Sequence, residues 1–228
     1  MPILLFDIDG TLVRGGGSGK AAMEAALRSA FGVASISDVV SYAGRTDGAI
    51  ALDLLRAHDL PPTAENATRL TATYLDALPE HLGRIPGEVC PGVGELLARL
   101  RGRGDVTLGL LTGNVARGAR TKLSHFGLWD YFPFGGFGDA GLERNEVARA
   151  AVVAAASHLN RRVEPSEVWV IGDTPLDVSC ARHIGARVVA VATGWHAHAE
   201  LALTGADVVL ETLADASALP RDWFGDSA

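Results

Sequence analysis

Two aspartates follow a short apolar run near the start of the chain, where they could act together on one ligand. Asp7 and Asp9 lie two residues apart, and side chains at this spacing on a strand project from the same face. Adjacent carboxylates repel each other, so the pair predicts a bound cation or a shared proton. Gly10 allows the chain to turn after them, and Thr11 adds a hydroxyl group. The alternative is a solvated strand end with ordinary turn acids.

A hydroxyl and an amide close the second apolar run of this kind. Thr112, Gly113 and Asn114 stand between that run and a helical pattern. The free N–H groups and the positive dipole end of a helix N-terminus favour phosphate oxygens, so these three residues are candidate phosphate ligands. Asn114 is equally suited to be the N-cap of the helix, and both roles stay open.

Two more acids, Asp173 and Asp177, follow the third run. Asp177 falls at the third position of the next helix, where a capping box would account for it. Capping does not account for Asp173, which we expect at the same sheet edge as Asp7 and Asp9, because open parallel sheets bind ligands at the carboxyl ends of their strands. Three acids from two strands in an oxygen-rich pocket suggest Mg²⁺.

The elements that must position these residues alternate between strands and helices, which is typical of a parallel α/β sheet. Apolar runs predict strands at 3–7, 106–111, 168–171, 187–192 and 207–210. Helical patterns follow at 92–103, 115–126, 145–159, 175–184, 197–203 and 214–219. Most of the strands are rich in Val, Ile or Leu without strict alternation, as expected when both faces are covered. We therefore predict the α/β class, with a Rossmann-like parallel sheet.

A helical segment interrupts this alternation directly after the first strand. Residues 15–85 carry only helical patterns, at 19–31, 47–58 and 63–82, between two glycine-containing connections. The simplest interpretation is a core domain of residues 1–14 and 86–228 with an inserted helical cap domain of residues 15–85.

These segments, in this order, resemble the haloacid dehalogenase superfamily of hydrolases. The first motif of that family is Asp-x-Asp-Gly-Thr, the second includes a Thr that closes an apolar strand, and the segment Gly-Asp-Thr-Pro-Leu-Asp of this sequence matches the fourth. The matching residues are Asp7, Asp9, Gly10 and Thr11, then Thr112, and finally Gly172 to Asp177. The helical insert resembles the cap of the phosphatase-type members, and the resemblance extends over about residues 3–210.

The third motif of the family usually centres on a lysine, and this sequence departs from that pattern. Only Lys20 and Lys122 are lysines, and neither lies where the motif is expected. Arg144 stands there, 32 residues after Thr112. An arginine can supply the fixed positive charge beside a phosphate, although it cannot donate a proton. Arg149 is the second choice, and a surface position at a helix start is the alternative interpretation of Arg144.

The resemblance implies a Mg²⁺-dependent phosphatase that works in two steps. Asp7 would attack phosphorus and form an aspartyl-phosphate. Asp9 would protonate the leaving oxygen and then activate the water that cleaves the intermediate. Mg²⁺ would bind Asp7, the main-chain carbonyl of Asp9, and Asp173. Thr112 and Arg144 would neutralise the phosphoryl oxygens, with the other residues of the motifs in support.

The cap offers one candidate for substrate selection. Arg45 follows Gly44 in a loop ahead of a cap helix, and in capped members of the family such a loop faces the active site. Arg45 would then bind a second anionic group of the substrate, while Asp47 is also explained as an acid in the first turn of a helix. Among the family members the resemblance is to phosphoglycolate phosphatases, which implies a small phosphorylated metabolite as substrate.

Three other functions stay open. A sugar phosphomutase of the same superfamily keeps both acids of the first motif. A phospho-acceptor signalling domain, which is not an enzyme, has a similar acidic pocket, but such modules lack a helical insertion after the first strand. A catalytically silent binding scaffold is the third possibility.

The composition of the 228-residue chain excludes several classes. A formal net charge of −7 argues against a nucleic-acid binder, which normally shows a basic stripe. No apolar run approaches the roughly 18 residues of a membrane span. Two cysteines are too few for a secreted disulfide framework. We therefore expect a cytoplasmic monomer or homodimer that binds neither nucleic acid nor membrane.

Overall fold

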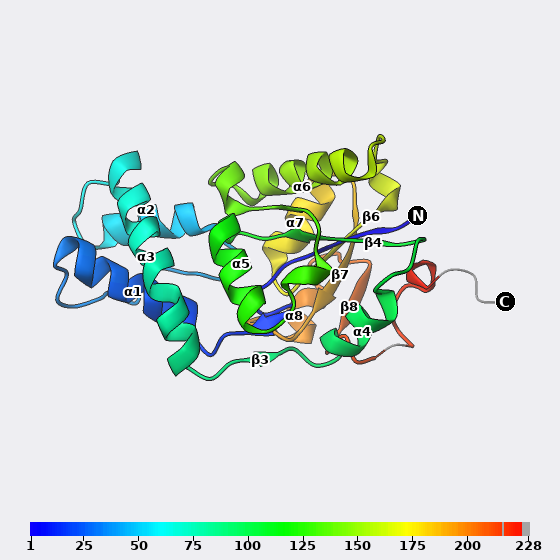
Figure 1. The fold of residues 1–228 in the computed structure, drawn as a ribbon, viewed down its shortest axis with the longest axis horizontal. Helices are drawn as coiled ribbons and strands as arrows, with labels where there is room; N and C mark the ends of the chain where they lie inside the picture. Colours follow the sequence, from blue (N-terminus) through cyan, green and yellow to red (C-terminus); the bar gives the residue numbers. More distant parts are fainter. Residues whose placement is uncertain (216, 225–228) are drawn as a thin grey trace.

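A parallel sheet of six strands forms the centre of the protein, in a computed structural model that describes residues 1–215 and 217–224. The strands are β1 (Ile3–Phe6), β4 (Thr107–Leu111), β5 (Gly135–Gly136), β6 (Val168–Gly172), β7 (Arg187–Val191) and β8 (Val208–Leu210). Their order across the sheet is β5-β4-β1-β6-β7-β8 (Figure 1). The predicted α/β class with a Rossmann-like parallel sheet is confirmed.

Residues of β1 alternate between two hydrophobic cores, one on each face of the sheet. Leu4 and Phe6 belong to one core, and Ile3 and Leu5 belong to the other. All four side chains are fully buried. A strand that is buried on both faces can be apolar at every position, which is why the run shows no alternation of apolar and polar residues.

Helices cover both faces of the sheet. The first core packs α4 (Val93–Leu100) and α5 (Ala116–His125) against the sheet. The second packs α6 (Arg144–Leu159), α7 (Pro175–His183) and α8 (His198–Ala202) against the opposite face. Parallel strands need such crossover connections, because the chain must return to the same end of the sheet before each new strand. Short 3₁₀ helices lie at Trp129–Tyr131, Gly138–Ala140, Pro165–Glu167 and Arg221–Trp223.

The segment between β1 and β4 contains three helices with a hydrophobic core of their own, and we call these helices the cap. They are α1 (Ser18–Phe31), α2 (Asp47–Ala57) and α3 (Ala64–Arg84). Thr46 and Thr63 are the N-caps of α2 and α3, and each side chain accepts a hydrogen bond from a backbone N–H of the first turn. The cap lies beyond the carboxyl ends of the strands, at the left of Figure 1.

A short antiparallel ribbon joins the cap to the sheet domain. It pairs β2 (Val13–Arg14) with β3 (Glu88–Val89). The sequence predicts connections here but not strands, because two residues are too few to show a periodic pattern. The two connections between the cap and the sheet therefore run side by side in this ribbon.

The structure also corrects the sequence analysis near the end of the chain. The five predicted strands are present, but β5 was missed because it consists of two glycines. The helix predicted at 214–219 is wrong: residues 214 and 217–219 form turns or bends rather than a helix. Residue 216 of that prediction lies outside the described residues. Leu213 and Leu219 are buried against the first core, so their apolar character reflects packing rather than helix periodicity.

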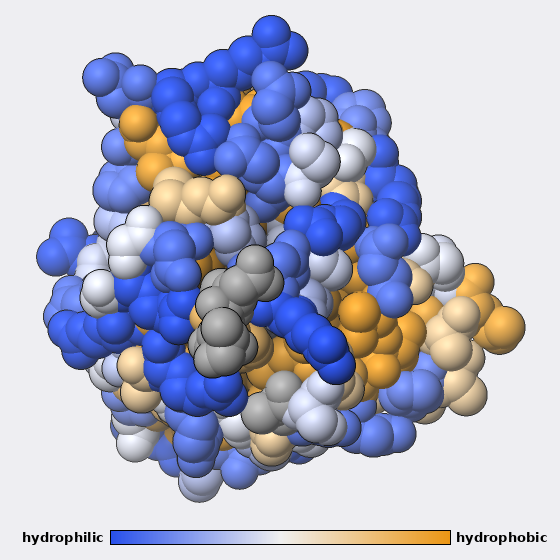
Figure 2. Space-filling model, turned by 90° about the vertical axis from the view of Figure 1, so that its right-hand side faces the viewer, coloured by the Kyte–Doolittle hydropathy of each residue, from blue (hydrophilic) through white to orange (hydrophobic). Residues whose placement is uncertain are grey.

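The end of the molecule remote from the cap has a largely hydrophilic surface. Figure 2 shows this end, with smaller areas of hydrophobic residues among the polar ones. Among the described residues, none of the helices combines the length and the apolar character that crossing a membrane would require.

Candidate active site

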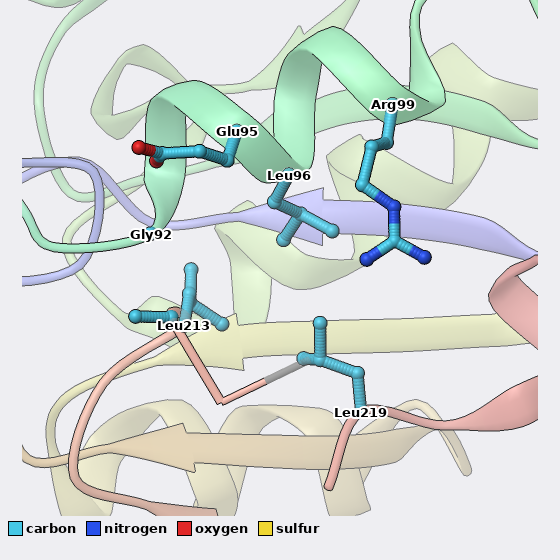
Figure 3. Close-up of a pocket in the computed structure, with 7 residues that line it drawn as sticks. Gly92, Glu95, Leu96, Arg99, Leu213 and Leu219 are labelled. Atoms are coloured by element: carbon cyan, nitrogen blue, oxygen red, sulfur yellow. The ribbon is translucent and has the colours of Figure 1, made fainter. Parts of the chain in front are cut away.

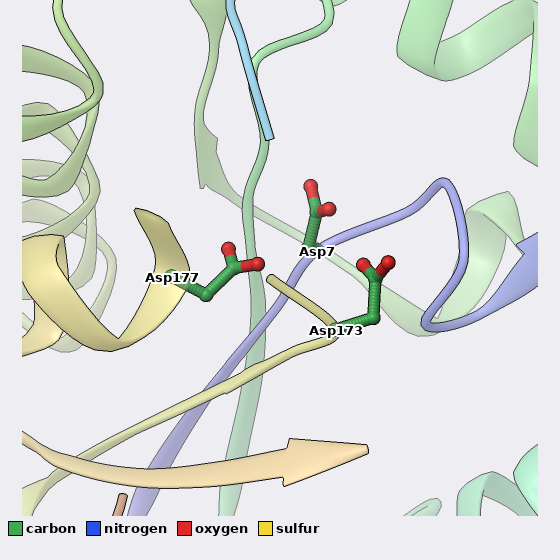
Figure 4. Close-up of side chains that lie close together, drawn as sticks. All are labelled: Asp7, Asp173 and Asp177. Carbon is green, nitrogen blue, oxygen red and sulfur yellow. The ribbon is translucent and has the colours of Figure 1, made fainter. Parts of the chain in front are cut away.

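Three buried acids meet at the carboxyl edge of the sheet. Asp7 directly follows β1 and Asp173 directly follows β6, and these two strands are neighbours. Asp177 joins them from the first turn of α7. Carboxylate oxygens of the three residues lie within 4.8 Å of one another, and Figure 4 shows the side chains turned toward a common space. The parallel order of the strands thus produces the convergence expected from the sequence.

Arg144 provides the positive charge inside this group. Its Nη2 lies 3.0 Å from Oδ1 of Asp7 and also donates to Oδ1 of Asp177. Arg144 is the first residue of α6, where Glu143 and Glu146 form a capping box. Burial lowers the pKa of the guanidinium, but Asp177 and Asp7 raise it by more, so the charge is permanent.

Burial leaves Asp7 with an unusual protonation behaviour. The pKa of its carboxyl group is raised to about 6 overall. Desolvation raises the pKa most, Asp177 and Asp9 also raise it, and Arg144 lowers it. Desolvation and the neighbouring acids disfavour the charged carboxylate, whereas the arginine favours it. The site as it stands therefore holds more negative charge than Arg144 alone balances.

Asp173 has one carboxylate oxygen that is hydrogen-bonded and one that is not. Its Oδ1 accepts a hydrogen bond of 3.2 Å from Thr11, but its Oδ2 is buried with no hydrogen-bond partner among the described residues. Gly10 and Gly194 press against this carboxylate so closely that a Cβ atom at either position would overlap it. Burial and the charges of Asp177 and Asp7 raise the pKa of Asp173. This acidic group could hold a metal ion, and all-oxygen donors suit a hard divalent cation.

Asp177 makes two sets of contacts, and the capping interpretation explains only one of them. Its Oδ2 accepts hydrogen bonds from the N–H and the hydroxyl of Thr174, at 3.0 and 2.7 Å. This is the capping box that the sequence predicts. The other oxygen holds Arg144, so Asp177 ties the start of α7 to the charged centre.

Asp9 is not part of the group of three acids and is paired with a different cation. Its Oδ2 accepts hydrogen bonds from Lys122 Nζ at 2.6 Å and from Asn114 Nδ2 at 2.8 Å. Desolvation raises the pKa of Asp9, but the charge and hydrogen bond of Lys122 and the hydrogen bond of Asn114 lower it by more, so the net shift is downward. Its side chain is 48% exposed, so the carboxylate stays accessible to a ligand.

The turn after β4 brings the predicted phosphate ligands to the same edge. Thr112 Oγ1 accepts two hydrogen bonds from Asn114, at 2.9 Å from the side-chain amide and at 3.3 Å from the main-chain N–H. The interpretation of Asn114 as a helix N-cap is wrong, because the N-cap of α5 is Val115 and the Asn114 amide turns to Asp9. Gly113 uses its carbonyl to accept the N–H of Asp47 at 2.8 Å.

The family model of the haloacid dehalogenase-like hydrolases matches residues 1–185. The chain belongs to this family. A probable phosphatase, IndB, of Dickeya dadantii is 30% identical over 224 residues, which cover 94% of this chain and 91% of that protein. A phosphoglycolate phosphatase of Cereibacter sphaeroides is 28% identical over 199 residues, covering 86% and 87%. The resemblance drawn from the motifs is confirmed, and these relatives support the expected enzyme class, a phosphoric monoester hydrolase.

A solved structure shares the fold of this haloacid dehalogenase-like hydrolase. CbbY from Rhodobacter sphaeroides, in complex with phosphate, has a TM-score of 0.75 at 18% identity and covers 94% of this chain and 96% of its own. At this identity the likeness concerns the fold alone.

The cap of this haloacid dehalogenase-like hydrolase docks directly on the charged centre. Arg144 Nη1 donates to the carbonyl of Gly44 at 3.1 Å, and the hydroxyl of Thr46 donates to the carbonyl of Leu142 at 2.8 Å. Oδ2 of Asp47 accepts the N–H of Val115, the N-cap of α5, at 2.9 Å. Hydrogen bonds to residues outside the cap therefore hold the loop 44–47.

The side chain of Arg45 takes a different course from the rest of this loop. Its Nη1 lies 2.6 Å from Oδ2 of Asp53 on α2, and it lines an open cavity of about 470 Å³ on the cap together with Arg56. The structure thus pairs Arg45 within the cap. Arg149, the second choice for the third motif, is exposed and lies beside His183.

Sequence reasoning missed two charged residues of this site. Lys122 was set aside because its spacing does not fit the third motif, yet it contacts Asp9. Its signal was its place on α5, where Gly118, Ala119, Lys122 and Leu123 form the buried face. Asp139 was not considered, because no local sequence pattern marks it. Its Oδ2 accepts a hydrogen bond from the N–H of Ala116 at 2.6 Å.

A second cavity lies apart from these acids. It measures about 240 Å³ between α4 and the segment after β8, and Figure 3 shows Leu96 and Arg99 on one side with Leu213 and Leu219 on the other. None of the predicted site residues lines it. This cavity is therefore separate from the group of carboxylates at the edge of the sheet.

Proposed function

We propose that this hydrolase is a Mg²⁺-dependent phosphatase of small phosphorylated metabolites, with phosphoglycolate-like monoesters as the substrate class. The observation that carries the proposal is the contrast between the two acids of the first motif. Asp7 is buried between Arg144 and Asp173, whereas Asp9 is accessible and held by Lys122 and Asn114. This arrangement suits one nucleophile and one acid–base group.

In the proposed reaction, Asp7 attacks phosphorus and displaces the ester oxygen. A new O–P bond forms as the ester O–P bond breaks, giving an aspartyl-phosphate. Asp9 in its protonated form donates a proton to the departing oxygen. As the carboxylate that Lys122 and Asn114 contact, it then removes a proton from the water that attacks the phosphorus of the intermediate, which restores the protonated form. Phosphate leaves and the Asp7 carboxylate is restored.

Thr112 and Arg144 are suited to hold the phosphoryl oxygens. Because the Thr112 oxygen already accepts two hydrogen bonds from Asn114, its own proton is available for a phosphoryl oxygen. Arg144 supplies a permanent charge and lies 3.0 Å from Asp7. Preorganised donors of this kind stabilise the charge of the transition state without reorganising.

The group of three carboxylates fits Mg²⁺. We propose that Asp7, Asp173 and the main-chain carbonyl of Asp9 hold it, with Asp177 close by. The support is the unpartnered Oδ2 of Asp173 and the close grouping of the three carboxylates. When bound, the ion neutralises charge on the phosphoryl oxygens and on the carboxylates around it.

The cap limits the size of the substrate in this proposal. We assign residues 15–85 to the cap domain and the rest to the core. The loop 44–47 is hydrogen-bonded to Arg144 and to Val115 beside the acids, which favours a small ester. Arg45 can bind a second anionic group of the substrate if it shares its charge with Asp53. The relatives named phosphoglycolate phosphatases support a substrate of this kind.

We also propose a cytoplasmic location. Cys90 and Cys180 are both free thiols and both buried, which is usual in a reducing compartment.

A panel of phosphate esters, assayed for released phosphate with and without Mg²⁺, tests the function. The wild-type protein should release phosphate only with Mg²⁺, and Asp7→Asn should release none. Phosphate release that is equal in the two proteins would contradict the nucleophile. Conversion of a sugar phosphate to its isomer without net phosphate release would instead identify a phosphomutase.

A further inference from the structure

Lys122 is a buried cation without a part in the four motifs, and it holds the side chain of Asp9. The Lys122 Nζ lies 2.6 Å from Oδ2 of Asp9. The lysine side chain is 8% exposed and that of Asp9 is 48% exposed. Asn114 donates to the same oxygen. The carboxylate is thus restrained at one oxygen while nearly half of the side chain stays open to a ligand.

The cap surrounds the head group of this lysine. Lys122 belongs to the core helix α5, which packs against cap helix α3. Gly19 of α1 lies next to the ammonium, because a Cβ atom there would be in van der Waals contact with Nζ, at 3.4 Å. Burial raises the pKa of Asp47 on α2 and of Tyr74 on α3, and the nearby Lys122 charge lowers both. All three cap helices therefore contribute to the surroundings of one core lysine.

Each of the two motif acids consequently has its own cation, and each cation also meets the cap. Arg144 joins Asp7 to the carbonyl of Gly44. Lys122 joins Asp9 to the enclosure made by α1, α2 and α3. A loss of the Arg144 contact would act on the charge at the nucleophile, whereas a loss of the Lys122 contact would act on the direction of the acid–base group.

We propose that Lys122 is a positioning residue that holds Asp9 in its working orientation, and that the docked cap keeps Lys122 in place. The proposal rests on the phosphatase function proposed above. Acid–base catalysis depends on the distance and direction of the proton transfer. A displacement of about 1 Å can cost on the order of 10²-fold in rate, so a residue that only orients Asp9 can have a large effect.

The leaving group of the substrate separates this role from a general structural one. An alkyl phosphate such as phosphoglycolate needs its leaving oxygen protonated, whereas p-nitrophenyl phosphate releases a stable anion without that proton. We expect Lys122→Met to lower kcat/KM for the alkyl ester by roughly 10²-fold and that for the aryl ester by only a few-fold. Lys20→Met is the matched control, because Lys20 is the other lysine and pairs with Asp38 on the exposed surface of the cap.

An equal fall in kcat/KM for both esters would overturn the proposal, since a variant with less folded protein or a damaged phosphate site loses both. Gly19→Val gives a second test that leaves the lysine in the chain. Its side chain should crowd Nζ and lower the alkyl-to-aryl ratio of kcat/KM in the same direction. An unchanged ratio in this variant would contradict the part assigned to the cap.

Crystal structures of the wild type and of Lys122→Met supply a readout that needs no turnover. We expect the Asp9 carboxylate to leave its place beside Asn114 while Asp7 stays beside Arg144. An unmoved Asp9 would overturn the role of Lys122 even if the enzyme is active. Failure of the phosphatase function itself would appear differently, as a wild-type protein that releases no phosphate from either ester.

Discussion

The guanidinium of Arg144 lies 3.0 Å from the carboxylate of Asp7, and both side chains are only 6% exposed. The same Nη2 atom reaches Asp177, and Nη1 holds the cap carbonyl of Gly44. One arginine thus connects the acid after β1, the helix after β6 and the cap. Its fork of donors makes these contacts possible, since an ammonium is a compact point charge without a planar fork.

Replacing Arg144 with Met should damage both stability and catalysis. Two buried carboxylates would lose their partner, which typically costs about 3 to 5 kcal/mol of unfolding free energy. Loss of one preorganised charge should lower kcat by roughly 10²- to 10³-fold. Denaturant unfolding and steady-state kinetics measure the two effects. Arg149→Met, on the exposed side of the same helix, should change stability by less than about 0.5 kcal/mol; similar losses in both variants would argue against the special place of Arg144.

Adding Mg²⁺ should stabilise the protein through Asp173. A ligand at 100 times its dissociation constant adds about 2.7 kcal/mol to the folded state, so the thermal midpoint should rise with Mg²⁺ and return with EDTA. Asp173→Asn should abolish this rise. Asp76→Asn, in an exposed ion pair between α3 and Arg117 of α5, should keep it. A full Mg²⁺ response in Asp173→Asn would place the metal elsewhere.

Gly194→Ala should block the metal site without removing any ligand. The added Cβ would overlap the Asp173 carboxylate, and overpacking of this kind costs about 1 to 3 kcal/mol. The Mg²⁺-dependent rise in thermal midpoint should be lost. Gly94→Ala is the matched control in helix α4, where nothing lies within 4 Å of the added atom; it should stabilise the protein by about 0.5 to 1 kcal/mol. A rise in the thermal midpoint of Gly194→Ala with Mg²⁺ that equals the wild-type rise would contradict the close approach of Gly194 to the Asp173 carboxylate.

Asp47 should make stability depend on pH in the acid range. Burial raises the pKa of its carboxyl group from 3.8 to about 6, with Lys122 and the Val115 N–H opposing the shift. The folded protein keeps this proton after the unfolded chain has lost it, so the contribution of Asp47 to stability falls as the pH rises from about 4 to about 6. Two pKa units correspond to about 3 kcal/mol at most.

Asp47→Asn, compared with the wild type, measures this contribution. The amide keeps an oxygen for the Val115 N–H and does not titrate in this range. In EDTA, Asp47→Asn should gain stability relative to the wild type as the pH rises from about 4 to about 6, by an amount within the same limit of about 3 kcal/mol. Thr46→Ser, a neutral change in the same loop, should show a constant difference. A difference for Asp47→Asn that is flat with pH would show that burial does not hold its proton.

Local patterns were sufficient for the framework of this protein. Strands buried on both faces are mostly apolar without strict alternation, so β1, β4, β6, β7 and β8 could be predicted from short apolar runs. Parallel strands bring their carboxyl ends to one edge, which is why Asp7 and Asp173 could be expected together. The predicted helix at 214–219 failed because buried leucines such as Leu213 and Leu219 also occur in irregular chain that covers a core.

Sequence by itself determined the α/β class, the helical insertion, and the meeting of the motif residues at one edge. Tertiary structure alone decided which cation serves which acid. Lys122 reaches Asp9 because α5 packs its buried face under the cap, and Asp47 reaches Val115 because the cap loop docks on the same helix. Such contacts join segments 68 to 113 residues apart. No periodic pattern of neighbouring residues encodes them, because they depend on how two separately built cores fit against each other.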